Sequence, residues 1–211
     1  MRTSLKPPPP WLRRLLLKVI DVASQPLCED TSSDPYHVNF RFFVEEVKKI
    51  GECNVLELGA RKSTIRSQFV GCKRYVGVDI HSGPDVDVTC DVHELAAALS
   101  PLDVRFDAVA TISTFEHLVM PWKAILEINK VMRPGGLLFI ATHPTWPPHE
   151  LPWDFWRYAD GAFHGLLNQA TGFEILRCNS GLPCRPDLQW NIATREIIAS
   201  QYPLEISCGS A

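Results

Sequence analysis

Short apolar runs alternate with stretches of helical periodicity along most of the chain. Apolar runs with few polar residues are typical of buried parallel strands, and apolar residues spaced three or four apart predict amphipathic helices. Seven strands are expected, at 53–58, 75–79, 86–90, 106–112, 137–142, 173–177 and 192–200. Helices are expected at 39–50, 62–70, 92–99, 116–132 and 161–170. This alternation predicts an α/β fold with a mostly parallel sheet, helices on both faces and an antiparallel last strand pair.

Residues 1–38 are interpreted as an extension that precedes a domain over 39–211. Pro7 to Pro10 favour a polyproline conformation, residues 11–23 have helical spacing, and a polar linker follows. Up to Ile20 this extension carries five positive side chains and no acid. The helix is therefore expected either to pack on the domain or on a second subunit, or to touch an anionic membrane peripherally. The chain is expected to be a monomer or a homodimer.

Composition narrows the function classes. A chain of 211 residues with 45% hydrophobic residues is expected to form one main domain. The net charge of −3 argues against a nucleic-acid binder, which normally has a basic face. Seven scattered cysteines without a CxxC pair indicate reduced thiols and a cytoplasmic protein. No apolar run approaches the roughly 20 residues that span a bilayer, so no transmembrane segment is expected.

Three of the predicted strands end on residues suited to binding a ligand. The first carries Glu57 and stops at Gly59, the second ends on Asp79, and the third is followed by Asp91. Because ligands of doubly wound sheets bind outside the carboxyl ends of the strands, these residues predict a site at that edge. Asp79 lies 22 residues beyond Glu57, the spacing at which a carboxylate accepts hydrogen bonds from a ribose.

Five segments carry a resemblance to a known family. They are VLELG (55–59), YVGVDI (75–80), CDVHEL (90–95), FDAVATISTFEHL (106–118) and NKVMRPGGLLFIAT (129–142), with a tight turn expected at 133–136. In order and spacing they resemble the class I S-adenosylmethionine-dependent methyltransferases of the type-11-like group. The resemblance implies a seven-stranded Rossmann-like fold and methyl transfer from S-adenosylmethionine to oxygen, nitrogen or carbon of a small molecule. The main alternative is a non-catalytic binding or scaffold protein with a degenerate cofactor loop.

The resemblance also implies roles for individual residues at the cofactor. Asp79 would bind the ribose and Asp91 the adenine amino group, with the backbone of Val92 completing the base edge. Gly59 would let the backbone approach the methionine portion. Glu57 would hold the glycine loop and the amino group, and Ser113 would lie near the transferred methyl.

The loop after the first strand departs from the family's G-x-G-x-G pattern. It reads Gly59-Ala60-Arg61-Lys62-Ser63, so two glycines are replaced. A pyrophosphate needs a close glycine-rich approach, which argues against a nicotinamide dehydrogenase. S-Adenosylmethionine has no phosphate, and Arg61 is predicted to pair with its carboxylate.

Residues after the fourth and fifth strands are the candidates for chemistry on the acceptor. The candidate general bases are His117, His143 and His149. Four residues of the following loop are predicted to wall the acceptor pocket: Trp146, Trp153, Trp156 and Arg157. The alternative is that the aromatic side chains pack the loop on the sheet, with Arg157 bonded to Asp154 or to a carbonyl. No metal site is expected, since the His-Glu pairs at 93–94 and 149–150 lack a second histidine four positions on.

Overall fold

The computed structural model describes residues 9–12, 14–15, 18, 35–144 and 146–179. The chain divides into two compact units, of which Asp30–Gly181 contains nearly all the described residues. Most of the helix predicted over 11–23 and all of the strand predicted over 192–200 lie outside the described residues. No helix of the described part is long and apolar enough to cross a membrane.

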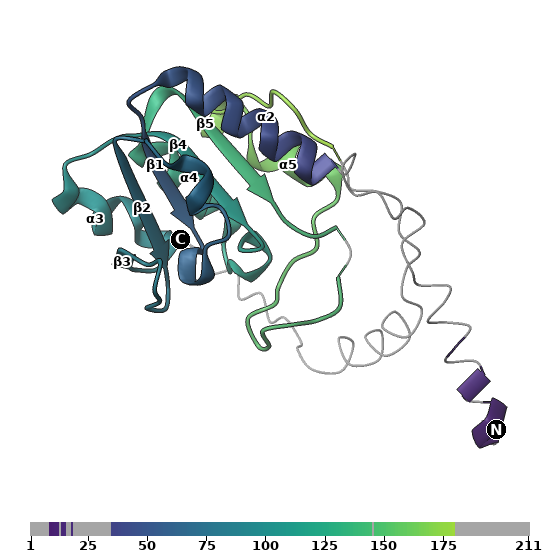
Figure 1. Ribbon diagram of the computed structural model, residues 1–211. Coiled ribbons are helices and arrows are strands. Elements are labelled where there is room, and N and C mark those ends of the chain that lie inside the picture. The colour runs from purple at the N-terminus through teal and green to yellow at the C-terminus, as the bar shows by residue number, and fades with distance from the viewer. Residues whose placement is uncertain (1–8, 13, 16–17, 19–34, 145, 180–211) are drawn as a thin grey trace, which may run out of the picture. The chain divides into compact units, whose positions relative to one another are not determined.

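Helices and strands alternate through the described domain (Figure 1). The α-helices are α2 (Pro35–Ile50), α3 (Leu95–Leu99), α4 (Pro121–Val131) and α5 (Asp160–Leu166). The strands are β1 (Asn54–Leu58), β2 (Arg74–Asp79), β3 (Val88–Thr89), β4 (Phe106–Ile112) and β5 (Met132–Ala141). Short 3-10 turns complete the order: η2 (Ala60–Lys62), η3 (Arg66–Phe69), η4 (Val92–Glu94), η5 (Ser100–Leu102), η6 (Phe115–His117) and η7 (Gln169–Thr171).

The five strands form one parallel sheet in the order β3-β2-β1-β4-β5. The chain builds outward from β1 to β3 on one side and then returns to place β4 on the other side of β1. The connections that leave the carboxyl ends of β1 and β4 therefore lie on opposite faces of the sheet. This is the topological switch point, where α/β sheets bind ligands. The predicted parallel α/β fold is confirmed in this respect.

Side-chain alternation along β1 shows how the sheet is covered on both faces. Val55 packs with Phe43 and Val47 of α2, whereas Leu56 packs with Leu95 of α3 and Ile125 of α4. Every residue of β1 is buried, as expected for a central parallel strand between two helical layers. The site at the carboxyl ends is thus built on a rigid base.

The sheet has five described strands, so the expected seven are not shown. Residues 173–177 form no strand, and an antiparallel pair is absent from the described residues. The fifth strand begins at Met132, because residues 133–136 continue it through an irregularity in its pairing with β4 instead of forming a separate turn.

The helix expected over 62–70 was also wrong. Two 3-10 turns, η2 and η3, stand there, separated by Ser63 in an extended conformation. The hydroxyl oxygen of Ser63 accepts a hydrogen bond from the backbone N–H of Arg66 at 3.1 Å, which starts the second turn afresh.

Candidate cofactor and acceptor site

Gly59 turns the chain sharply at the carboxyl end of β1. Its φ of +84° is in the left-handed region, and its N–H donates to the carbonyl of Val78 at 2.9 Å. A Cβ at this position would lie 2.0 Å from the Thr114 hydroxyl oxygen. Only glycine therefore fits between β1 and the loop after β4.

Asp79, at the end of β2, fixes the first loop. One carboxylate oxygen accepts from the backbone N–H of Arg61 at 3.2 Å and the other from the N–H of His81 at 2.9 Å. A carboxylate has about four acceptor positions, so two remain for ribose hydroxyls. Among the described residues the exposed Arg61 guanidinium has no hydrogen bond or ion pair, and its pairing with the cofactor carboxylate stays a prediction.

Asp91 is held in place by His93 at the start of η4. The backbone N–H and the ring Nδ1 of His93 lie 2.9 and 2.6 Å from Asp91 Oδ1. His93 Nε2 accepts from the N–H of Met120 at 3.2 Å, so the ring proton is on Nδ1 and is donated to Asp91. Partial burial raises the pKa of Asp91, but these hydrogen bonds outweigh it and the pKa is lowered. Val92, the predicted contact of the base edge, is buried beside it.

Glu57 is buried between β1 and β2. Its carboxylate accepts a hydrogen bond from the Tyr75 hydroxyl at 2.6 Å. Burial raises the pKa of Glu57, while hydrogen bonds from Ser63 and Tyr75 partly oppose that shift. The contacts of Glu57 thus brace the loop that follows β1, and its predicted contact with the cofactor amino group is untested.

The loops after β4 and β5 bring a histidine cluster together. Ser113 has a φ of +49°, which strains a non-glycine residue, and its hydroxyl lies 3.3 Å from His143 Nε2. The ring centroids of His117 and His149 lie 4.8 Å apart, and those of His143 and His149 lie 6.0 Å apart. The three candidate bases therefore share one site, although sequence separates them by up to 32 residues.

Glu116 lies beneath this cluster and is fully buried. One of its oxygens accepts from the Thr142 hydroxyl at 2.7 Å, and the other faces His143 Nε2 at 3.3 Å. Burial lowers the pKa of His143, the Glu116 charge opposes this, and His149 and Arg157 add to the lowering. The net shift favours the neutral imidazole, which is the form that accepts a proton.

Sequence reasoning placed Glu116 among the residues that face the methyl and interpreted the Glu116-His117 pair as cofactor-pocket or helix-start structure, but it did not predict that Glu116 would lie between His143 and His149. The signal available was an acid directly after the fourth apolar run, followed by a histidine-rich loop after the fifth. Two such segments meet whenever their strands are neighbours in a parallel sheet, as β4 and β5 are.

Arg157 clamps the loop that carries the aromatic residues. Its five N–H donors bond to Asp154 through both oxygens and to three backbone carbonyls, those of Trp146, Pro147 and Trp156. The hydrogen bonds from Arg157 lower the pKa of Asp154 to about 2. All five donors of Arg157 are thus used within the loop, which agrees with the bond to Asp154 or a carbonyl in the alternative interpretation, and the place of Arg157 in the acceptor-pocket wall stays a prediction.

The aromatic residues of this loop differ in their surroundings. Trp146 is exposed and stacks on His143, with ring centroids 4.9 Å apart, and Trp153 is also exposed. Trp156 instead donates its indole N–H to the carbonyl of Leu118 at 2.7 Å and meets Trp122 edge-on. Trp146 thus borders the histidine cluster directly, and the pocket role of all three stays a prediction.

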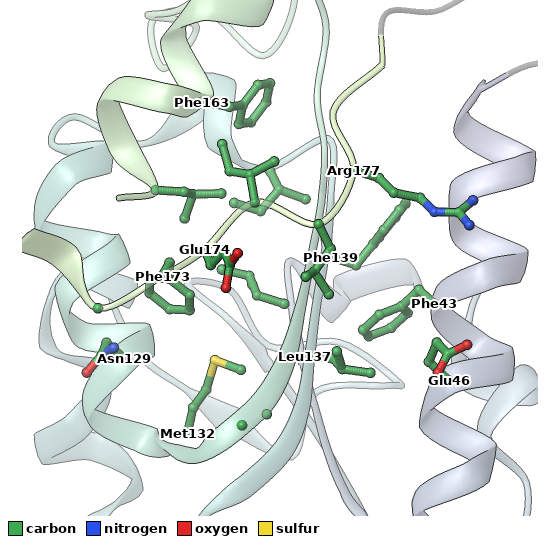
Figure 2. A pocket seen from close by; sticks show the side chains of 18 of the residues that line it. Phe43, Glu46, Asn129, Met132, Leu137, Phe139, Phe163, Phe173, Glu174 and Arg177 are labelled. Carbon is green, nitrogen blue, oxygen red and sulfur yellow. The ribbon is translucent and has the colours of Figure 1, made fainter. Parts of the chain in front are cut away.

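A cavity of about 930 Å³ lies away from these strand ends, along the outer edge of β5. Phe43 of α2, Phe139 of β5 and Phe173 line it, as Figure 2 shows. The charged side chains of Glu174 and Arg177 lie at the chain segment that crosses it. None of the predicted cofactor or catalytic residues is among those that line it, so we place the functional site at the strand ends.

Comparison with known proteins gives one family. Residues 56–140 match the sequence model described as a methyltransferase domain. A search of curated proteins finds no match.

Several solved structures share the architecture at low similarity. The N-methyltransferase NodS from Bradyrhizobium japonicum WM9, in complex with S-adenosyl-L-homocysteine, is 16% identical with a TM-score of 0.38, over 58% of this chain and 70% of that one. A 1,6-didemethyltoxoflavin-N1-methyltransferase from Burkholderia thailandensis is 17% identical with a TM-score of 0.45, over 80% and 81%. A chain of the complex between the Haloferax volcanii Trm112 methyltransferase activator and a putative methyltransferase is 15% identical with a TM-score of 0.48, over 68% and 74%. These values say nothing about the substrate of this chain.

A methyltransferase domain implies S-adenosylmethionine as its cofactor, and the residues present fit that molecule. Asp79 keeps acceptor capacity for a ribose after fixing the first loop. Asp91 Oδ2 has no hydrogen-bond partner among the described residues and lies beside the buried Val92. The match of residues 56–140 to a methyltransferase domain and the parallel sheet with its switch point next to β1 are consistent with a class I S-adenosylmethionine-dependent methyltransferase.

Proposed function

We propose that the protein is an enzyme that transfers the methyl group of S-adenosylmethionine to a small-molecule acceptor. The observation that carries this proposal is the methyltransferase-domain match over 56–140, which spans the strand ends holding Asp79 and Asp91. The acceptor would lie against Ser113, His143 and the loop that follows β5.

The cofactor would lie across the carboxyl ends of β1 to β3. Asp79 would accept hydrogen bonds from the ribose, and Asp91 with Val92 would bind the adenine. Gly59 and Arg61 would meet the methionine portion, with the Arg61 guanidinium pairing with its carboxylate. The contacts of Gly59, Arg61 and Asp79 would therefore suit a cofactor that has no phosphate.

The sulfonium of the cofactor supplies the activation, and the protein supplies alignment. An acceptor that must lose a proton needs a base, and the histidine cluster of His117, His143 and His149 lies where that base would act. Exposed Trp146 next to His143 offers an apolar face for a small acceptor. The net charge of −3 and the histidine-rich loop favour a small molecule over a nucleic acid.

Calorimetry of the intact chain with S-adenosylhomocysteine tests the cofactor part of the proposal. We expect saturable binding that Asp79→Asn weakens by at least about 10-fold, because hydrogen bonds to a charged group contribute about 1.5–3 kcal/mol. Asp103→Asn is the matched control, since Asp103 is exposed, precedes the amino end of β4 instead of following a carboxyl end, and has a φ of +47° that asparagine tolerates.

Turnover tests the catalytic part. The intact chain with S-adenosylmethionine and a panel of small hydroxylated and aminated compounds should release S-adenosylhomocysteine faster than without an acceptor. No heat at millimolar cofactor would replace the proposal with a non-catalytic binding or scaffold protein. No described contact favours that alternative at present.

A further inference from the structure

Three side chains with metal-binding atoms converge on one point behind Ser113. Glu116 comes from η6 after β4, His143 follows β5, and His149 belongs to the loop beyond it. Their ligand atoms all lie within 4.8 Å of one another. Glu116 Oε1 is 3.3 Å from His143 Nε2 and 3.9 Å from His149 Nε2.

The Glu116 oxygen that faces the two rings is unsatisfied. Glu116 is fully buried, and its other oxygen already accepts from the Thr142 hydroxyl. Oε1 has no hydrogen-bond partner among the described residues. A buried carboxylate oxygen without a donor is costly, so its position between two imidazole nitrogens points to a cation that the three groups share.

The protonation of His149 supports metal binding through Nε2. Its Nδ1 lies 3.1 Å from the carbonyl oxygen of Pro147, and a carbonyl can only accept. The ring proton is therefore on Nδ1, which leaves the Nε2 lone pair directed at the site. Asp154 Oδ2 lies 3.4 Å from the same Nδ1. A metal-binding histidine usually donates its second nitrogen to a carbonyl or a carboxylate in this way.

The spacing and the donor set suit zinc. Tetrahedral coordination at about 2.0–2.1 Å places neighbouring ligand atoms about 3.3 Å apart, as found between Glu116 and His143. The separation between Glu116 Oε1 and His149 Nε2, 3.9 Å, would have to shorten by roughly half an ångström to match it. Two imidazoles and one carboxylate favour zinc or a similar transition metal over magnesium or calcium, which prefer oxygen ligands throughout.

We propose that Glu116, His143 and His149 bind a divalent transition-metal ion of the zinc type at the acceptor end of the site. This departs from the expectation of no metal site, which considered only histidine pairs on one helix. The three ligands come from three segments that the parallel order of β4 and β5 brings together. Three protein ligands leave a fourth position open, as in catalytic zinc sites.

The role of the ion rests on the proposed function. Ser113 borders the site, 3.3 Å from His143 Nε2, so the open position lies where the acceptor is expected. An acceptor hydroxyl bound there would become more acidic and would lose its proton to solvent water, because His143 and His149 as metal ligands would not act as bases. Its oxygen then forms a bond to the methyl carbon as the carbon–sulfur bond of the cofactor breaks, which releases S-adenosylhomocysteine. His117 stays outside the metal ligands.

Titration of the metal-stripped, full-length chain with Co²⁺ tests the site. We expect one equivalent to bind at micromolar or tighter affinity, with visible absorption typical of low-coordinate cobalt, and Zn²⁺ to displace it. Excess Mg²⁺ should not. Absence of saturable Co²⁺ binding would overturn the proposal, and so would equal competition by Mg²⁺.

Variants locate the ligands. His143→Ala and His149→Ala should each weaken Co²⁺ binding by more than about 100-fold, beyond the 10- to 100-fold typical of outer-shell residues. Glu116→Gln should do the same, but it replaces a fully buried group, so the histidine variants are decisive if it fails to fold. His164→Ala, an exposed change in α5, is the control and should leave binding unchanged.

A second set of residues could bind a metal ion instead. His117, His149 and Asp154 also lie within reach of one ion, although Asp154 is already paired with Arg157 through both oxygens. Loss of Co²⁺ binding in His117→Ala with retention in His143→Ala would overturn the proposed ligand set. The titration needs neither cofactor nor acceptor, so calorimetry with S-adenosylhomocysteine on the same sample tells failure of the proposed function apart from failure of the metal site.

Discussion

Gly59 and Gly51 provide a matched pair of residues for measuring how tightly the first loop is packed. Both have a positive φ, +84° and +78°, but a Cβ would meet Thr114 only at Gly59. We predict that Gly51→Ala lowers the free energy of unfolding by about 1–2 kcal/mol, for the left-handed conformation alone. Gly59→Ala should lose about 1–3 kcal/mol more, for the clash. Urea denaturation measures both.

The clash can be tested separately. Thr114→Ala combined with Gly59→Ala should recover most of the additional loss, because the hydroxyl that the new methyl group meets is gone. Equal losses in the two single glycine variants would show that Thr114 moves aside freely.

The contribution of the Arg61 side chain to cofactor affinity can be tested directly. Its backbone N–H holds Asp79, so replacing the side chain leaves that hydrogen bond intact. We predict that Arg61→Ala weakens binding of S-adenosylhomocysteine by about 10-fold or more, the effect of losing a hydrogen bond between charged groups. Calorimetry measures the change. Lys62→Ala, the exposed neighbour, should bind as the parent does, and unchanged affinity in Arg61→Ala would remove the proposed pairing.

The residues that sequence placed well are those that end apolar runs. Asp79 ends β2 and Asp91 follows β3, as the apolar pattern predicted, because a charged side chain is more easily solvated where a strand leaves the sheet. The bond of Arg157 to Asp154 was one of two sequence interpretations, but the contacts of Glu116 with His143 and His149 were not predicted. They depend on how two loops fold over each other, and local periodicity carries no information about that.

At the scale of elements, the first loop and its two strands contain a buried acid whose effect depends on pH. Burial raises the pKa of Glu57 above that of an unfolded chain, about 4.3. Between the pKa of the unfolded chain and the raised pKa of Glu57, the folded protein binds more protons than the unfolded one. The free energy of unfolding therefore falls as pH rises through this range. Glu57→Gln removes the titration and keeps an oxygen for the Tyr75 hydroxyl. We predict that the variant gains stability relative to the parent as pH rises.

Urea unfolding from about pH 4 to about pH 8 measures this difference. The exposed change Glu52→Gln, next to β1, controls for loss of a negative charge. A constant gap between Glu57→Gln and the parent across the series would contradict a raised pKa at Glu57.

The strands that the sequence predicted correctly are the ones that lie inside the sheet. β1, β2 and β4 are flanked on both sides, and their apolar runs agree with the structure within two residues. The strand expected over 173–177 has an apolar pattern but no ladder partner among the described residues, and pairing is a tertiary property. The helix expected over 62–70 was wrong because the chain becomes extended at Ser63, which ends η2, and a second 3-10 turn, η3, begins at Arg66.

At the scale of the whole molecule, several properties stay predictions. They are the role of the basic extension, the choice between monomer and homodimer, and the cytoplasmic location. Among the described residues, Cys53, Cys72 and Cys90 form no disulfide. The reduced state expected for all seven cysteines stays a prediction.

Ligand-induced stabilisation tests the whole molecule at once, since a bound cofactor would connect β1, β2 and the loop after β3. A ligand that binds only the folded state at 100 times its dissociation constant adds about 2.7 kcal/mol. For a domain of this size each kcal/mol raises the melting temperature by about 2–4 °C. We therefore predict that S-adenosylhomocysteine raises the melting temperature by about 5–10 °C under that condition.

A dinucleotide should give no such shift. Its pyrophosphate needs backbone N–H groups approached across glycines, and Arg61 and Ser63 occupy the positions of two of them. Thr114 already fills the space over Gly59, the glycine that remains. Equal stabilisation by NAD and S-adenosylhomocysteine in a melting experiment would mean that the loop accepts a phosphate after all. A shift with S-adenosylhomocysteine alone would assign to the altered glycine loop a selectivity for a cofactor that carries no phosphate.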